Sequence, residues 1–114
     1  MELAARRCEA CRSDSPPVPD EAIAGLLSKV PDWELVERND ERRLKRTFTF
    51  PDFGQALTFT TEVGRLAEAE DHHPTILLRW GKVTVTWWTH AIRGLHENDF
   101  IMAAKSDAVY ADHR

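Results

Sequence analysis

The sequence predicts an α+β fold: an antiparallel four-stranded sheet with three helices packed on one face, in the order α-β-β-α-β-β-α. Three observations lead to this expectation. Apolar residues recur at helical spacing in three segments, they alternate with polar residues in four others, and turn residues separate the segments. A chain of 114 residues with 42% hydrophobic content can bury a core as one domain without disulfides.

The N-terminal residues 1–19 are expected to form a flexible tail, and residues 20–114 a single domain. The prolines of the segment S-D-S-P-P-V-P prevent a helix from running through the end of the tail. Asp20 is then the expected N-cap of a first helix that Pro31 closes. The apolar stripe of this helix consists of Ile23, Leu26, Leu27 and Val30.

A β-hairpin should follow the first helix. Alternation begins at Trp33, and Asn39-Asp40 supplies turn chemistry between the two strands. On the second strand, the positions expected to face the core are Leu44, Phe48 and Phe50. Arg46 interrupts this apolar side and is expected to lie at its edge, with its charge reaching solvent.

The longest predicted helix runs from Asp52 to about Glu70. The apolar positions at helical spacing are Phe53, Ala56, Leu57, Val63, Leu66 and Ala67. The last turn brings Glu68 and Asp71 next to two histidines. Acidic groups at a helix C-terminus are disfavoured by the helix dipole, which indicates that they have a function there.

A second hairpin is predicted from residues 75–80 and 83–90, with Gly81-Lys82 as its turn. One side of the last strand, expected to face the core, carries Val83, Val85 and Trp87; the other carries Thr84, Thr86, Trp88 and His90. Trp80 is also expected in the core. The final helix should run from about His96 to Ala111, and its expected packing stripe is Ile101, Ala104, Ala108 and Ala111.

Composition narrows the classes of function. A formal net charge of −4 argues against a protein that binds the phosphate backbone of nucleic acids, so the basic cluster within residues 42–46 is interpreted as a solvated strand face. No apolar run is long enough to span a bilayer, and no secretory signal is present, so we expect a cytoplasmic protein. The C-E-A-C pair at Cys8 and Cys11 can be a redox pair or half of a zinc site, but the remaining zinc ligands are missing, which favours two thiols of a flexible tail.

Three histidines stand out as candidates for acid–base catalysis: His72, His73 and His90. Pro74 disfavours helix at the residue before it, so the adjacent pair should lie where a helix ends and a strand begins. Two alternatives remain. Zinc could bind the histidines together with Asp71 or Glu68, although neighbouring residues of an extended chain point to opposite sides. The histidines could also be purely structural.

The spacing of these residues resembles that of the pterin-4a-carbinolamine dehydratases. The shared pattern is E-x-x-x-H-H-P, then an aromatic residue after five positions, a histidine after nine more and an aspartate after a further eight. These positions are occupied here by Glu68, His72, His73, Pro74, Trp80, His90 and Asp99. The likeness extends over residues 20–110. Two departures are Ile76, where many members carry an aromatic residue, and the bulky Trp87-Trp88 pair.

The resemblance implies dehydration of a 4a-hydroxytetrahydropterin to the quinonoid dihydropterin and water, which recycles the pterin cofactor of aromatic amino-acid hydroxylases. It implies no metal and no organic cofactor, a small-molecule pterin partner rather than nucleic acid or membrane, and a homodimer or homotetramer. The implied catalytic residues are His72, His73 and His90. The implied substrate-binding residues are Glu68, Asp71 and Trp88, with the two acids fixing imidazole tautomers. Asp99 is expected to stabilise the start of the last helix.

A second function remains open from the same resemblance. Relatives of this fold act as non-enzymatic modules, one in the dimerisation of a homeodomain transcription factor and another in the assembly of a carbon-fixing carboxylase. An exposed sheet face bearing Trp88 would suit such binding. A role in molybdopterin metabolism is a third, weaker alternative. The three histidines and both carboxylates favour catalysis, because a module used only for binding does not need them.

Overall fold

The computed structural model describes residues 3–8 and 16–113. Four strands form one antiparallel sheet in the order β1-β2-β4-β3: β1 (Glu34–Arg38), β2 (Glu41–Thr49), β3 (Thr75–Arg79) and β4 (Lys82–Trp87). The helices are α1 (Asp20–Leu27), α2 (Phe53–Glu70) and α3 (Glu97–Ala111), with two short 3-10 segments, η1 (Leu3–Ala5) and η2 (His90–Ile92). The predicted fold class and element order are confirmed.

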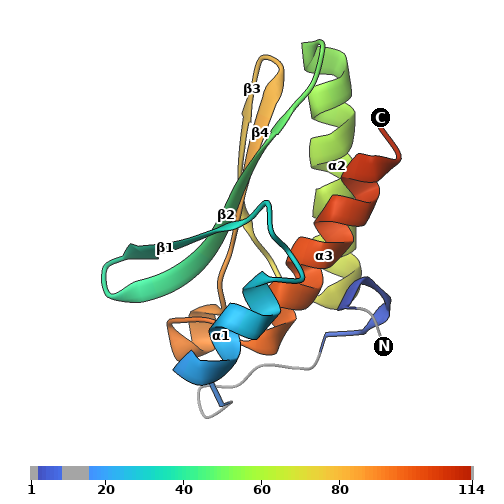
Figure 1. Cartoon of the computed structure of the whole chain (residues 1–114). Helices are drawn as coiled ribbons and strands as arrows, with labels where there is room; N and C mark the ends of the chain where they lie inside the picture. Colours follow the sequence, from blue (N-terminus) through green and yellow to red (C-terminus); the bar gives the residue numbers. More distant parts are fainter. Residues whose placement is uncertain (1–2, 9–15, 114) are drawn as a thin grey trace.

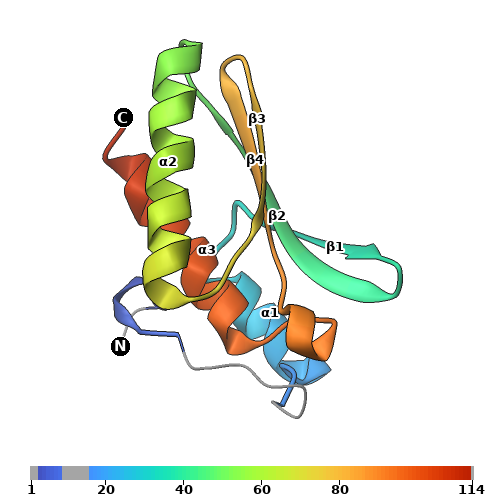
Figure 2. The ribbon, with the colours of Figure 1, turned by 180° about the vertical axis from the view of Figure 1, so that it is seen from behind.

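Two layers build the domain. Helices α2 and α3 lie side by side across one face of the sheet, and α1 lies beside the N-terminal half of α3 (Figure 1). Figure 2, from the opposite side, shows the β1–β2 hairpin reaching away from the helices while β3 and β4 run alongside α2. The two segments that carry the candidate histidines, after α2 and after β4, both lie at the lower end of the sheet in these views.

The core lies between the sheet and the two long helices. The strand alternation is confirmed, because Val83, Val85 and Trp87 are fully buried, as are Leu44 and Phe48 of β2. The helices contribute the remaining large side chains, chiefly Phe59 and Val63 from α2 and Phe100, Ile101 and Met102 from α3. Each such side chain stabilises the fold by about 1.5–3 kcal/mol relative to an exposed one.

Both hairpin turns contain residues in the left-handed backbone conformation. Asn39 and Asp40 have φ angles of 54° and 63°, as a two-residue turn of type I′ requires, so the predicted first hairpin is confirmed. The second turn consists of Trp80 and Gly81, one residue earlier than expected, with Gly81 at a φ of 70°. A Cβ at Gly81 would stand 3.0 Å from the carbonyl oxygen of Phe50, so this position favours glycine on two counts.

Arg46 lies at the edge of the apolar face, as expected, but its charge does not reach solvent: its side chain is 15% exposed and pairs with acidic side chains. Its guanidinium sits 4.4 Å from the centre of the Phe48 ring, and Nη1 lies 2.6 Å from Oδ1 of Asp107 on α3. The same carboxylate oxygen accepts a hydrogen bond from Nε1 of Trp33 at 2.8 Å. Burial raises the pKa of Asp107, and these two donors oppose the rise. The contacts of Asp107 with Arg46 and Trp33 therefore join the first hairpin and the residue before it to α3.

Several expectations about individual side chains are wrong. Trp80 is 72% exposed, because it occupies the two-residue turn rather than a strand. Pro19, not Asp20, is the N-cap of α1, and the Asp20 carboxylate pairs with Arg42 at 2.5 Å instead. Helix α2 leaves Phe53 and Leu57 exposed, at 43% and 46%.

The packing side of α3 is also different from the predicted stripe. Of that stripe, Ile101 is buried, whereas Ala108 and Ala111 are exposed. The buried residues concentrate in the first half of the helix, from Asn98 to Ala103. The reason is tertiary: α2, the sheet and η1 enclose the first half, whereas the last turns pack on β2 and α2 through Tyr110, which leaves Ala108 and Ala111 on the solvent side.

The N-terminal residues 3–8, expected to belong to the flexible tail, pack against the helices. Leu3 is 5% exposed, and Nζ of Lys105 on α3 donates to the carbonyl oxygen of Ala4 at 2.8 Å. Cys11 lies outside the described residues, so the interpretation of the C-E-A-C pair stays a prediction, as does the domain boundary at residue 20. Among the residues described, no helix is both long and apolar enough to cross a membrane.

Candidate active site

The end of α2 orients the two adjacent histidines in different directions. Asp71 closes the helix in a left-handed conformation, with a φ of 51°, and the backbone N–H of His72 donates to the carbonyl oxygen of Ala67. Pro74 follows the pair directly, and β3 begins at Thr75. As a result His72 is buried, at 8% exposure, whereas His73 is exposed. The predicted helix-to-strand junction is confirmed.

His72 is held between an aromatic ring and a carboxylate. Its ring lies parallel to that of Trp87, with an angle of 8° between the planes and 5.8 Å between the centroids. Nε2 of His72 lies 2.7 Å from Oδ1 of Asp99 on α3. A carboxylate only accepts hydrogen bonds, so Nε2 carries the proton that faces Asp99, and in the neutral imidazole Nδ1 holds the lone pair.

Asp99 is fully buried and connects three parts of the chain. Besides His72, it contacts Thr89, whose hydroxyl donates to Oδ2 at 2.7 Å, and the backbone N–H of His96, which donates to Oδ2 at 3.0 Å. His96 in turn caps the helix, because its Nδ1 accepts from the backbone N–H of Asn98 at 3.0 Å. Asp99 therefore stabilises the start of α3, as expected, and also orients a candidate catalytic histidine.

His73 forms a separate pair with Glu68. The distance between His73 Nε2 and Glu68 Oε2 is 2.5 Å, and both side chains are more than half exposed, at 53% and 77%. Asp71, the other expected acidic residue, is exposed and forms no hydrogen bond or ion pair with the three histidines. The structure thus brings Glu68, rather than Asp71, to the histidine pair.

His90 lies just beyond the end of β4, where the strand gives way to η2. Its exposed ring packs on Trp88, with 4.4 Å between the centroids, and Arg43 of β2 lies 3.9 Å from the centre of the Trp88 ring system. A bridge between Thr89 and Gly94 closes this short loop. Because Thr89 also binds Asp99, the loop that carries His90 is fixed to the carboxylate that holds His72.

Sequence reasoning missed several residues of this arrangement. Asp99 was expected only to stabilise a helix, and Thr89, His96 and Arg43 were given no role at the site. The signal for Asp99 was present in its spacing from His90. Nothing in the sequence indicated the contacts of Arg43, because β2 is brought beside β4 only by the sheet order.

Metal binding was one alternative for the histidines. Within the described residues, no group of three or more His, Cys, Asp or Glu side chains is placed to hold a metal ion. His72 and His73 point to different surroundings, as the extended chain between them requires.

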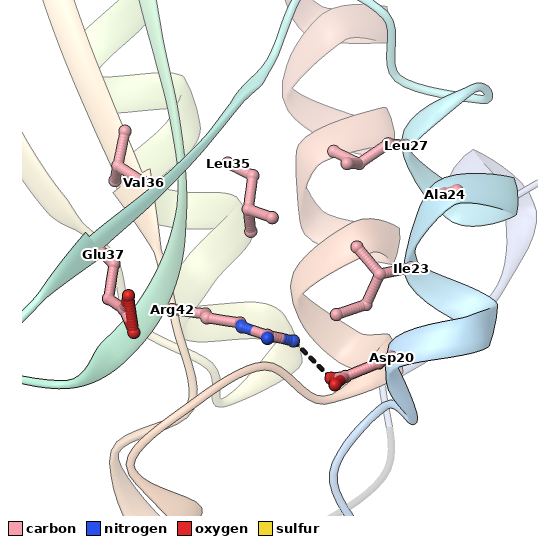
Figure 3. A pocket seen from close by; sticks show the side chains of 8 residues that line it. All are labelled: Asp20, Ile23, Ala24, Leu27, Leu35, Val36, Glu37 and Arg42. Atoms are coloured by element: carbon pink, nitrogen blue, oxygen red, sulfur yellow. Dashed lines mark hydrogen bonds and ion pairs between the residues drawn. The ribbon is translucent and has the colours of Figure 1, made fainter.

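Another cavity lies away from the histidines. It has a volume of about 570 Å³ and lies between α1 and β1, where Ile23, Leu27 and Leu35 point toward one another (Figure 3). The ion pair between Arg42 and Asp20 borders it. No histidine lines this cavity, so it offers no group for proton transfer near neutral pH.

This chain is similar to known proteins in sequence and in fold. The family model for pterin 4 alpha carbinolamine dehydratase matches residues 16–109. A crystal structure described as the transcriptional coactivator/pterin dehydratase from Brucella melitensis is 28% identical, with a TM-score of 0.75 over 83% of this chain and 99% of that chain. A pterin dehydratase-like protein, identified as a RuBisCO assembly factor in the alpha-carboxysome, is 23% identical, with a TM-score of 0.57 over 68% of this chain and 89% of that chain.

The second of these likenesses, at 23% identity, shows the fold alone. The family match is stronger evidence, because it covers most of the chain, including both segments that carry the candidate histidines. With this match and the shared fold, the chain belongs to the pterin 4 alpha carbinolamine dehydratase family.

Proposed function

We propose that this protein dehydrates 4a-hydroxytetrahydropterins to quinonoid dihydropterins and water, and so recycles the pterin cofactor of aromatic amino-acid hydroxylases. The observation that carries the proposal is the buried His72–Asp99 pair, in a chain of this family, fixed through Thr89 to the loop of a second, exposed histidine, His90. We expect the enzyme to act in the cytoplasm as a homodimer or homotetramer.

The reaction needs one acid and one base and no change of oxidation state. The C4a–O bond and the N5–H bond of the substrate break, and a C4a=N5 double bond forms. An acid gives its proton to the departing hydroxyl, which leaves as water, and a base takes the proton from N5. Imidazole can perform either task near neutral pH, and each such group typically contributes about 10²–10⁴-fold to a rate.

The surroundings of the three histidines support one role as the base and another as the acid. His72 has its Nε2–H directed to Asp99, which leaves Nδ1 as a proton acceptor of fixed orientation, suited to a base. His73 and His90 are exposed, so either can exchange protons with solvent and act as the acid toward the departing hydroxyl. Glu68 would keep His73 oriented, and Asp71 and Trp88 would contact the pterin.

The test is a dehydratase assay with 4a-hydroxytetrahydropterin generated in situ, in which absorbance follows the quinonoid product. We expect the protein to accelerate the reaction above its spontaneous rate. His72→Ala and His90→Ala should each lower the enzymatic rate at least about tenfold, as loss of a proton-transfer group predicts.

His113→Ala is the matched control, because His113 lies at the C-terminal end and pairs with Glu62 on α2, away from the other histidines. Its rate should stay within about twofold of the original, since no proton-transfer group of the proposed site is lost. Circular dichroism establishes that each variant is folded. Folded protein that gives no acceleration would overturn the dehydratase proposal for this substrate.

In that event, a non-enzymatic assembly module becomes the leading interpretation. Its support is the likeness to the pterin dehydratase-like assembly factor of the alpha-carboxysome, which extends to the fold. The two interpretations differ in their requirement for the histidines: a binding module should tolerate His72→Ala wherever the variant folds.

A further inference from the structure

A shallow pocket of about 330 Å³ adjoins both segments that carry the candidate histidines. Thr75, which lines it, begins β3 directly after the His73-Pro74 segment, and Trp88, which also lines it, packs on the His90 ring. Lys45 pairs with Thr86, and Thr86 pairs with Thr75, so these three residues lie side by side across β2, β4 and β3. The charged residues of the lining are Glu37, Arg38, Arg43 and Lys45.

The charge of this pocket is opposite to that of the chain. The chain carries a net charge of −4, yet the pocket lining holds three basic side chains and one acidic side chain. Glu41 pairs with Arg43 at 3.0 Å, but it also pairs with Arg93 at 3.1 Å. Hydrogen bonds from Arg93 and, to a smaller extent, Arg43 lower the pKa of Glu41, so this carboxylate is ionised at neutral pH. Because the single carboxylate of Glu41 pairs with both Arg43 and Arg93, a net positive charge remains beside the pocket, which favours the binding of an anion.

Arg43 is the fixed donor of this group. Its guanidinium lies against Trp88, and its side chain is 15% exposed. Within the described residues, its buried Nε–H has no hydrogen-bond partner. A guanidinium held in one orientation beside the pocket is suited to binding a carboxylate or phosphate oxygen through its terminal nitrogens. Lys45 lies two residues further along the same strand, is exposed, and can supply a second, adjustable cation.

We propose that this pocket is an anion subsite of the pterin site, and that the substrate is a pterin whose side chain carries a carboxylate or phosphate group. The inference rests on the proposed dehydratase function and narrows its substrate class. Arg43 and Lys45 bind the anionic group, the hydroxyls of Thr75 and Thr86 donate hydrogen bonds to it, and the pterin ring lies toward His90.

The test compares two pterins that differ in the charge of the side chain. Fluorescence titration at low ionic strength measures the dissociation constants of 6-carboxypterin and the neutral 6-hydroxymethylpterin. We expect the carboxylate to bind about tenfold more tightly, because a charge-assisted hydrogen bond distinguishes it. The preference should shrink as salt is added.

Lys45→Gln should lower the affinity for 6-carboxypterin more than that for 6-hydroxymethylpterin, by about fivefold or more, since it removes a cation that only the carboxylate uses. Arg43→Gln should do the same, and the exposed Lys45 keeps the test decisive if the Arg43 variant does not fold. Arg65→Gln is the control, because Arg65 is an exposed cation on α2 outside the pocket. It should leave both affinities unchanged.

The outcomes separate the two proposals. Equal affinities for the two pterins, together with dehydration of the neutral substrate, would overturn the anion subsite and leave the dehydratase intact. Selective binding of 6-carboxypterin without dehydration of any pterin would overturn the dehydratase alone. Binding of neither pterin, with no dehydration, would overturn both.

Discussion

Asp99 accepts hydrogen bonds from three groups that lie far apart in the sequence. His72 binds one oxygen, and Thr89 and the backbone of His96 bind the other. Such a carboxylate fixes the tautomer of the imidazole that it holds, in the same way that outer carboxylates fix metal-bound or catalytic histidines. At the scale of single residues, Asp99 is therefore the group on which the orientation of His72 depends.

We predict that Asp99→Asn reverses the tautomer of His72. The oxygen of the asparagine should stay with its two donors, Thr89 and the His96 backbone, which turns the NH₂ group toward Nε2 of His72. The proton then moves to Nδ1, and the dehydration rate should fall at least about tenfold. Nitrogen NMR of the histidine rings reads the tautomer directly.

The control is Asp112→Asn, an exposed change at the C-terminal end of α3. It should alter neither the ring-nitrogen shifts of His72 nor the rate. An Asp99→Asn protein with the original tautomer and the original rate would contradict the role assigned to Asp99. A loss of stability alone, with the tautomer retained, would limit Asp99 to capping α3.

The elements meet at the candidate site through their ends. Helix α2 ends next to His72, β4 ends before Thr89, and α3 begins near Asp99. The N-terminal segment, residues 3–8, also contacts the end of α2. Glu70, the last residue of α2, accepts a hydrogen bond from the backbone N–H of Cys8 at 2.8 Å and forms an ion pair with Arg7 at 2.8 Å. The Glu70 side chain is 7% exposed. At the scale of elements, the N-terminal segment therefore holds the α2 end from which His72 extends.

We predict that Glu70→Gln weakens the fold in a manner that depends on pH. The Cys8 N–H, with Arg7, lowers the pKa of Glu70, so its stabilising effect is complete above the unfolded pKa and is lost as pH falls through the folded value. The variant should have a free energy of unfolding about 1–2 kcal/mol lower at pH 7, and the difference should vanish at a low pH, below the folded pKa of Glu70. Urea unfolding at both pH values measures it.

Glu34→Gln, an exposed change on β1, serves as the comparison and should shift the free energy of unfolding by less than about 0.5 kcal/mol at either pH. If Glu70→Gln lost the same amount at pH 7 and at low pH, the effect would come from packing and not from the charge of the carboxylate.

The whole domain leaves large apolar side chains on its surface. Leu35 and Leu77 lie on the two edge strands, Phe53 and Leu57 on α2, and Trp80 at the β3–β4 turn; each is more than 40% exposed. Burying such side chains against another copy of the chain would remove apolar area from water at both the sheet and the helix layer. The whole-molecule prediction is therefore a homodimer or homotetramer.

Light scattering after size-exclusion chromatography should give two or four times the chain mass of 13.1 kDa. The temperature of unfolding should also rise with protein concentration, because association stabilises only the folded chains. A mass of one chain at micromolar concentration, with an unfolding temperature independent of concentration, would refute an oligomer.

The sequence could predict the strands and helices because their signals are local. The alternation around Val83 and Val85, the helical spacing of 52–70 and the turn at Asn39-Asp40 depend on neighbours within a few residues. The misassigned residues depend on contacts between elements. Trp80 is exposed because the turn begins one residue earlier than expected, and Ala108 is exposed because the last turns of α3 pack on the core through Val109 and Tyr110 instead.

The sequence by itself determined the fold class, the order of the elements and the histidine pattern that relates the chain to its family. Periodicity and motif spacing are properties of the chain alone. Only the tertiary structure decided which groups meet: that Asp99 rather than Asp71 holds His72, and that Arg43 packs on Trp88. These contacts arise where separate elements converge, and neither periodicity nor spacing specifies the packing that brings their ends together.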